Sequence, residues 1–248
     1  MVEEYDSIVW NSVWDVVPRL KDKSLVSSRW LYKVKQVADG SVEKHKARFV
    51  ARGFSQVEGI NYHETFALVE RYSSIRLLLA LSTQMGWKIH QMDVKTTFLN
   101  SKIEKEVNIE QPEGFETFNR ESHVCQLKRA LYGLKHEPCA WYTRTDNYFI
   151  GLGFTKSEAD VNLYHIMVEG KPFIIVLYVD DLILTGDDQL IKSCKEDLVR
   201  EFEMKDMGLM HYFLDIEVWQ KDGEVFVSQG KYAKEILRKF HMEKCKPM

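Results

Sequence analysis

A pair of adjacent aspartates between two apolar runs limits the fold more than any other feature of this chain. Residues 173–179 read Phe-Ile-Ile-Val-Leu-Tyr-Val, Asp180 and Asp181 follow, and a second apolar run covers residues 182–184. Apolar and β-branched residues on both sides of a short polar step predict a β-hairpin. Its two strands would be buried, and the aspartates would lie at its tip.

Two neighbouring carboxylates on an apolar hairpin repel each other and lose hydration, so they need a compensating partner. A divalent cation such as Mg²⁺ or Mn²⁺, which takes hard oxygen ligands, is one such partner. Aspartate is also a common turn residue, so an ordinary turn is the alternative. The residues alone leave both interpretations open.

Composition limits the other classes. A chain of 248 residues with 45% hydrophobic residues can bury a real core and predicts two or more subdomains. The net charge of −3 gives no general attraction for nucleic acid, so any such binding must come from local patches. Four cysteines without CxxC spacing complete no zinc pattern, which favours a reduced, intracellular protein. We find no signal peptide or apolar run of transmembrane length, and we expect no membrane partner.

One local patch is strongly basic. Residues 29–54 hold seven Lys or Arg residues against two acids. Asp39-Gly40 between two alternating runs predicts a hairpin, on whose second strand Lys44, Lys46 and Arg48 project from one face. A solvated strand face is the simpler explanation, but the surplus of positive charge favours a surface for phosphates.

The remaining periodicities predict both helices and strands. Asp93, near the end of a predicted strand, could cap the following element or serve as a third metal ligand. In chain order, we expect a helix up to about Asp15 and a loop at Pro18, a helix over 72–85 that is buried nearly all round and ends at Gly86, a strand over 87–94, a helix from Pro138, a helix over 188–202, a hairpin within 209–227, and a helix over 231–240 with Tyr232, Ile236 and Phe240 inward.

Several motifs in register resemble one family. Gln91–Asn100 (QMDVKTTFLN) and Tyr178–Asp181 (YVDD) are similar to the two carboxylate motifs of the reverse transcriptase of Ty1/copia-type retrotransposons. The other matching motifs are Lys46–Gln56, Glu64–Ala67, Glu110–Phe115, Leu131–Lys135 and Phe202–Asp206. The resemblance runs in order from about Trp14 to the last residue.

The resemblance implies an α+β fold, the fingers and palm of a right-hand polymerase. We expect an antiparallel palm sheet with helices on one face and only the start of a thumb. The implied segments are 1–86 for the first part of the fingers, 87–102 for the palm strand with the first carboxylate motif, 103–138 for the second part of the fingers, 139–228 for the palm with the YVDD and primer-grip-like hairpins, and 229–248 for the start of the thumb.

The resemblance also implies RNA-directed DNA polymerase activity, a nucleotidyl transfer from a deoxynucleotide to a primer 3′-hydroxyl. Two Mg²⁺ ions, for which Mn²⁺ can substitute, would be held by Asp93, Asp180 and Asp181 with help from the Val94 carbonyl. These three aspartates would be the catalytic residues.

The family assigns further residues to the substrates. Lys46 and Arg48 would hold the triphosphate, Phe98 would lie under the sugar, and His136 would lie beside the nucleotide. The residues implied for primer and template are Tyr178, Phe213, Leu214 and Asp215. The implied partners are an RNA or DNA template with its primer, deoxynucleotides, and the integrase and RNase H of a larger polyprotein. The expected location is a cytoplasmic virus-like particle or the nucleus.

This chain departs from the family pattern at several positions. Glu137 replaces a small neutral residue, Cys139 replaces an arginine, and Asp215 replaces a glycine. We expect the Glu137 carboxylate to lie near a nucleotide phosphate and to weaken binding. The alternative is that the loop points this carboxylate into water, where it costs almost nothing. Because of these departures, the alternative function is a folded remnant that binds nucleic acid without turnover.

Overall fold

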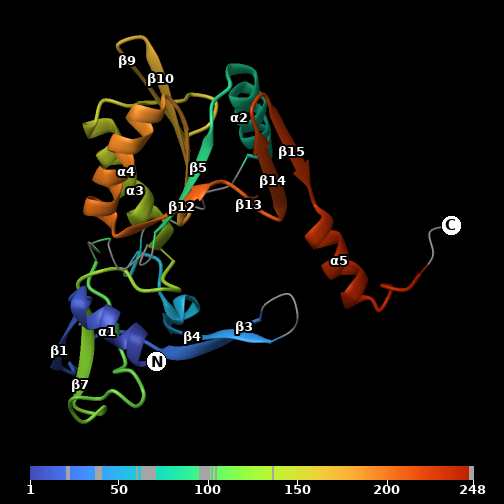
Figure 1. Ribbon diagram of the computed structural model, residues 1–248. Coiled ribbons are helices and arrows are strands. Elements are labelled where there is room, and N and C mark those ends of the chain that lie inside the picture. Colours follow the sequence, from blue (N-terminus) through green and yellow to red (C-terminus); the bar gives the residue numbers. More distant parts are fainter. Residues whose placement is uncertain are drawn as a thin grey trace. The chain divides into compact units, whose positions relative to one another are not determined.

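The computed structural model describes residues 1–20, 23–36, 41–59, 61–62, 71–94, 101, 103, 105–135 and 137–245. The chain is a mixed α+β protein, which confirms the predicted class, and it divides into two compact units (Figure 1). The first unit comprises Met1–Leu68 and Thr96–Tyr148, and the second comprises Val69–Lys95 and Phe149–Met248. Their assignment to fingers, palm and thumb stays a prediction.

The first unit is built on two small sheets and a helix. Its apolar core includes Ile8, Phe49 and Leu131, all of which are almost inaccessible to solvent. The elements are helix α1 (Val2–Trp10), a four-stranded sheet in the order β1 (Trp14–Pro18), β7 (His123–Leu127), β6 (Asn108–Ile109) and β2 (Leu25–Val26), the hairpin of β3 (Ser28–Gln36) and β4 (Val42–Ala51), and the short helix η1 (Gly53–Ser55).

Helix α1 is shorter than the sequence predicts. It ends at Trp10, and Ser12 has a left-handed φ of 50° that stops helical continuation. Residues Trp14–Pro18, expected as the end of the helix and a loop, form strand β1 and pair with β7. Val16 and Val17 favour a strand because they are β-branched, and Pro18 is tolerated because β1 is an edge strand. The predicted helix is therefore wrong beyond Trp10.

The basic hairpin is confirmed. Strands β3 and β4 pair antiparallel, with Trp30 opposite Phe49, and the two rings lie 5.1 Å apart between centroids. Phe49 belongs to the core of the first unit. The predicted turn at Asp39-Gly40 lies outside the described residues, as does the motif Glu64–Ala67.

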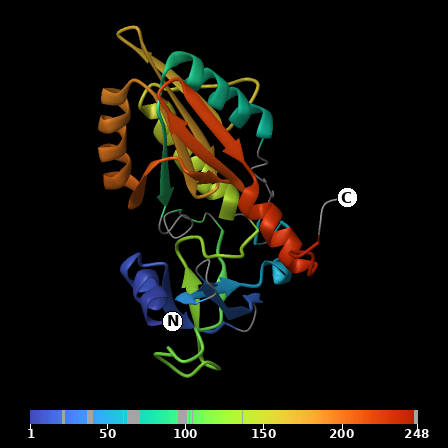
Figure 2. The same ribbon diagram turned by 45° about the vertical axis from the view of Figure 1, so that its right-hand side comes forward.

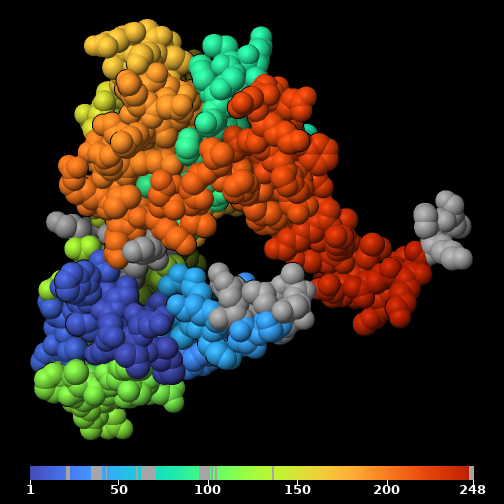
Figure 3. All heavy atoms as spheres, in the orientation of Figure 1, coloured from blue at the N-terminus to red at the C-terminus, as the bar shows by residue number. Residues whose placement is uncertain are grey.

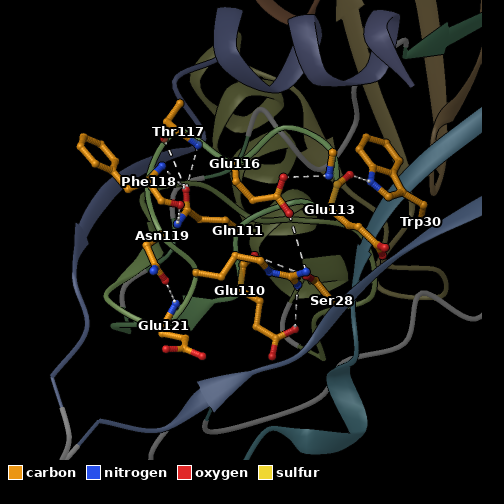
Figure 4. Close-up of polar contacts among 12 residues, drawn as sticks. Ser28, Trp30, Glu110, Gln111, Glu113, Glu116, Thr117, Phe118, Asn119 and Glu121 are labelled. Carbon is orange, nitrogen blue, oxygen red and sulfur yellow. Dashed lines mark hydrogen bonds and ion pairs between the residues drawn. The ribbon is translucent and has the colours of Figure 1, made fainter.

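A buried glutamine organises the loop that follows β6. Gln111 donates hydrogen bonds to the carbonyls of Phe118 and His123 at 3.1 Å. Its Oε1 accepts from the backbone N–H of Thr117 and Phe118 at 3.1 and 3.3 Å (Figure 4). The Trp30 indole anchors the same loop through the Glu113 carbonyl. This part of the Glu110–Phe115 motif is therefore structural.

Two glycines bring two loops of the first unit into backbone contact. A Cβ on Gly133 would lie 2.3 Å from the Ala51 carbonyl oxygen, and one on Gly53 would lie 2.2 Å from the Gly133 carbonyl oxygen. Gly133 also has a φ of 90°, which favours glycine. The Lys135 N–H donates to Oε1 of Gln56 at 2.7 Å, which fixes the same contact.

The second unit is centred on a six-stranded antiparallel sheet (Figure 2). The strand order is β12 (Met204–Leu209), β5 (Ile89–Val94), β11 (Asp181–Gly186), β10 (Lys171–Tyr178), β9 (Leu163–Val168) and β8 (Thr155–Lys156). A second, three-stranded sheet has the order β13 (Tyr212–Phe213), β14 (Ile216–Lys221) and β15 (Glu224–Ser228). The helices are α2 (Tyr72–Met85), α4 (Asp188–Phe202), α5 (Gly230–Lys239) and the last residues of α3 (Glu137–Gly151), which begins in the first unit.

The predicted aspartate hairpin is confirmed. Strands β10 and β11 pair antiparallel, and Tyr178 lies opposite Asp181. Most of their side chains are buried, and β11 lies between β5 and β10 inside the sheet. The predicted helix over 188–202 is also confirmed, since the Asp187 side chain caps α4 by accepting from the N–H groups of residues 189 and 190.

Helices cover both faces of the large sheet, whereas the sequence predicted one. Ile89 belongs to the core cluster that includes Ile75 and Leu78 of α2, while His90 contacts Lys195 of α4. Adjacent strand residues point to opposite faces, so α2 and α4 lie on different sides. Helix α2 ends at Gly86 as predicted, but its outer side is open and Leu77 is 65% exposed. It is therefore not buried all round.

The inward face expected for α5 is also wrong. No residue of α5 is buried, and Tyr232, Ile236 and Phe240 are all exposed. In the space-filling view this segment projects from the rest of the second unit (Figure 3). Within the described ranges no helix is long and apolar enough to cross a bilayer. All four cysteines are free thiols.

Candidate active site

Two strands of the large sheet bring the predicted carboxylates to one place. Asp93 on β5 is in register with Asp181 on β11, and directly opposite residues have Cβ atoms about 5 Å apart on one face. The Val94 N–H donates to the Asp180 carbonyl at 2.8 Å, which ties the hairpin turn to the end of β5. Asp180 itself is exposed in that turn. Three carboxylates from distant parts of the sequence are thus gathered in the second unit.

The environment of Asp181 is unfavourable for its charge. Burial, followed by repulsion from Asp180 and Asp93, raises the pKa of Asp181 to about 6. The Gln91 side chain donates to its Oδ1 at 2.8 Å and partly offsets this effect. Sequence reasoning gave Gln91 no role, although its two-residue spacing from Asp93 places both on one strand face.

The donor chemistry of this cluster fits a hard divalent cation. Mg²⁺ takes carboxylate oxygens, and a bound cation would relieve the repulsion that raises the pKa of Asp181. Over the described part of the chain, however, no three His, Cys, Asp or Glu side chains are grouped closely enough to hold an ion. The carboxylates are therefore neighbours without forming a closed ligand set.

A lysine completes the row of charges across the sheet. Lys205 on β12 is in register with Asp93, on the side opposite Asp181, and its side chain is exposed. Cross-strand neighbours share a face, so a cation flanks the acidic cluster. Sequence reasoning assigned Lys205 no role, because nothing local to residues 202–206 shows that β12 pairs with β5.

The opposite face of β5 carries a separate polar contact. Lys195 of α4 donates to Nδ1 of His90 at 3.0 Å and to both Asp206 oxygens at 2.8 and 2.9 Å. Burial, and then the Lys195 charge, lower the pKa of His90. These bonds hold α4 and β12 against β5, so they support the strand that carries Asp93.

Two of the residues predicted for primer and template meet in the second unit. The rings of Tyr178 and Phe213 lie 5.6 Å apart at an interplanar angle of 82°. Leu214 and Asp215 form the tight turn after Phe213, with left-handed φ values of 49° and 61°. The Tyr212 hydroxyl donates to Asp215 at 2.8 Å, and this bond raises the pKa of Tyr212 to about 12.

The residues predicted to bind the nucleotide belong to the first unit. Lys46 and Arg48 both lie on β4, where alternation puts them on one face. The Arg48 guanidinium donates to Oε2 of Glu4 at 2.8 Å and stacks on the Tyr132 ring. Phe98 and His136 lie outside the described residues.

Glu137 does not have the position expected for it. Its side chain is buried, with 5% of the residue exposed, and its Oε2 accepts from the Gly133 N–H at 2.7 Å. Burial raises the pKa of Glu137 to about 8, although the backbone hydrogen bonds from Gly133 and Leu134 lower it. The expectation that this carboxylate faces a nucleotide phosphate is not compatible with such burial. Glu137 instead braces the turn before α3.

Comparison with known proteins identifies the class to which this arrangement of strands and acidic residues belongs. Residues 11–248 match the family model described as reverse transcriptase (RNA-dependent DNA polymerase). The chain therefore belongs to the reverse transcriptase family, whose members are nucleotidyltransferases.

Several similar proteins come from Ty1/copia-type transposons. The chain is 37% identical over its whole length to the retrovirus-related Pol polyprotein from transposon RE1 of Arabidopsis thaliana, and 36% identical to that from transposon TNT 1-94 of Nicotiana tabacum. It is 32% identical over 57% of its length to a putative transposon Ty5-1 protein of Saccharomyces cerevisiae. The chain spans only 17% and 19% of the two plant polyproteins.

Proposed function

We propose that this chain is the polymerase domain of a copia-type retrotransposon and catalyses RNA-directed DNA synthesis. The observation that carries the proposal is the register of Asp93 with Asp181, next to the exposed Asp180. Membership of the family supports it, because the matched residues 11–248 include both segments that contribute these aspartates. In this proposal the second unit contains most of the palm, the thumb residues 229–248 and residues 69–86 of the fingers, and the first unit contains the rest of the fingers.

The three aspartates would hold two Mg²⁺ ions, or Mn²⁺ in their place, with the Val94 carbonyl as an additional ligand. When bound, the ions supply positive charge that stabilises the attacking and leaving oxygens of phosphoryl transfer. The raised pKa of Asp181 supports this assignment, because burial, and then repulsion from Asp180 and Asp93, disfavour a charge that a bound cation would stabilise. Gln91 would keep the Asp181 carboxylate oriented through its hydrogen bond.

Other residues would position the substrates. Lys46 and Arg48 would bind the triphosphate, since fixed donors on one strand face suit phosphate oxygens. Phe98 would contact the sugar and His136 the nucleotide. Tyr178 and the segment Phe213–Asp215 would support the primer 3′ end and the template, and the contact of the Tyr178 and Phe213 rings favours their acting together.

The proposed partners are an RNA or DNA template with its primer, and deoxynucleotides. Because the chain matches less than a fifth of each plant polyprotein, we propose that it functions within a larger polyprotein that includes integrase and RNase H. The proposed location is a cytoplasmic particle or the nucleus.

Primer extension on a primed RNA template with Mg²⁺ or Mn²⁺ tests the proposal. Wild type and the control Asp222→Asn, an exposed aspartate in the β14–β15 turn, should extend the primer, whereas Asp180→Asn should not. A folded wild-type chain that binds the primed template but extends it with neither metal would favour the alternative, a remnant without turnover.

A further inference from the structure

A partly buried ion pair connects the N-terminal helix to the basic strand. Glu4 of α1 accepts a hydrogen bond from Nη1 of Arg48 at 2.8 Å, and α1 packs against β4 within the first unit (Figure 1). Glu3 reaches the same strand through Lys44 at 3.0 Å, but this second pair is largely exposed. Two adjacent acids of α1 therefore have very different environments.

The environment of Glu4 is costly for a carboxylate. The residue is 7% exposed, and its Oε1 is buried without a hydrogen-bond partner. Glu4 lies one turn before Ile8, which anchors α1 in the apolar core. An apolar side chain at position 4 would dock the helix without leaving a buried oxygen unpaired. Removing one partner of an ion pair is costly mainly when the other charge is left buried, and 28% of the Arg48 side chain stays exposed to solvent. Docking of the helix alone does not account for a carboxylate here.

The effect of Glu4 on Arg48 accounts for a carboxylate at position 4. The carboxylate holds one terminal nitrogen of the guanidinium, and the Tyr132 ring lies 4.5 Å from the Arg48 Cζ. The arginine is thus restrained by both a charged group and an aromatic face, while 28% of its side chain stays exposed. A guanidinium fixed in this way loses less freedom when its remaining donors bind an anion.

We infer that Glu4 is a positioning residue that holds Arg48 ready for the nucleotide triphosphate. The inference rests on the proposed function, because it takes from there the role of Arg48. Glu4 does not contact the nucleotide in this arrangement, and acts only through the arginine. Its loss should therefore weaken nucleotide binding and leave the rate at saturating nucleotide unchanged.

The test measures dTTP affinity by titration into the full chain bound to a primed RNA template. A dideoxy-terminated primer prevents turnover, so the measurement does not depend on catalysis. The variants are Glu4→Gln, Glu4→Met and Arg48→Met, with Glu3→Gln as the matched control that removes the neighbouring exposed acid. KM and kcat follow from extension of an unblocked primer, and thermal melting reports stability.

We expect Glu4→Gln and Glu4→Met to raise the dTTP Kd and KM about ten-fold, the size of effect that loss of an orienting partner produces at other sites. Neither variant should lower kcat, and Glu4→Met should melt close to wild type, because the Arg48 charge that it leaves unpaired is partly exposed to solvent. Glu3→Gln should leave the Kd within two-fold. In the Arg48→Met background, Glu4→Gln should add no further loss, because the two residues act as one unit.

Several results would overturn the inference. An unchanged dTTP Kd in the Glu4 variants would do so, as would an equal loss of dTTP affinity in Glu3→Gln. A tighter Kd in the Glu4 variants would show that Glu4 competes with phosphate for Arg48. Destabilisation of Glu4→Met together with a lower kcat would show a purely structural role. If Arg48→Met itself binds dTTP normally, or wild type binds none, the role assigned to Arg48 fails as well. A loss with Arg48→Met but none with Glu4→Gln rejects only the inference.

Discussion

Replacing Glu137 by glutamine should change how the stability of the chain depends on pH. Glu137 has a pKa of about 8 in the folded chain, against an ordinary value of 4.5. The folded state therefore retains a proton that the unfolded state releases between these values. A carboxyl with a raised pKa contributes stability that is fully present below pH 4.5 and lost as the pH rises through 8. Between pH 5 and pH 8 this loss amounts to roughly 3 kcal/mol.

The glutamine variant lacks this titration but keeps an oxygen that can accept from the Gly133 N–H. Urea unfolding of wild type, Glu137→Gln and the control Glu121→Gln, which alters an exposed acid, should be followed at pH 5, 6, 7 and 8. Wild type and the control should lose stability relative to Glu137→Gln as the pH rises. A constant difference between wild type and Glu137→Gln over this range would refute the reasoning, because the carboxyl would then have an ordinary pKa.

Three further predictions concern the second unit and the glycine contact. Asp180→Asn should abolish the rise in melting temperature that Mg²⁺ gives wild type, because a ligand bound only by the folded state stabilises it; equal shifts in both would exclude the site. Because the pKa of His90 is lowered, its contribution to stability is present above pH 6.5 and is lost as the pH falls. The urea midpoints of wild type and His90→Gln should therefore converge between pH 7 and pH 5, and midpoints that stay parallel would contradict this. Gly133→Ala should destabilise the chain by roughly 3 kcal/mol or more in urea unfolding, because its Cβ would clash with the Ala51 carbonyl and Gly133 has a left-handed φ. The control Gly151→Ala, whose Cβ would have no atom within 4 Å, should not be destabilised in this way. Equal stability of the two variants would contradict the contact.

The elements that local patterns specify could be predicted. The hairpin of β10 and β11 follows from two apolar runs around Asp180, and α4 follows from its aspartate cap and apolar spacing. Helix α2 ends where Gly86 adopts a left-handed φ of 70°, which its place after the apolar pattern had indicated. In each case the residues that determine the element lie within it or directly beside it.

Features that depend on distant pairing could not be predicted. The register of Lys205 with Asp93 joins strands about 110 positions apart, and no local pattern determines it. The burial of Glu4 depends on β4, whose Arg48 is 44 positions away. Glu137 accepts from Gly133, only four positions before it, but no pattern in that turn indicates its burial. Both acids look exposed in sequence because charge usually indicates solvent. Whether such a charged side chain is buried or exposed depends on which other segments pack against it.

The division of the chain has a consequence for its folding during synthesis. Each unit is made of two stretches that are separated in the sequence by part of the other unit, so neither unit is synthesised as one continuous segment. The first unit is incomplete until residues near 148 have left the ribosome. By then α2 and β5 have been synthesised, but β5 is still unpaired because its partners β11 and β12 come later in the chain. A core strand whose partners lie about 90 residues later in the chain can pair wrongly before they are synthesised. We therefore expect chaperones to assist folding of the nascent chain.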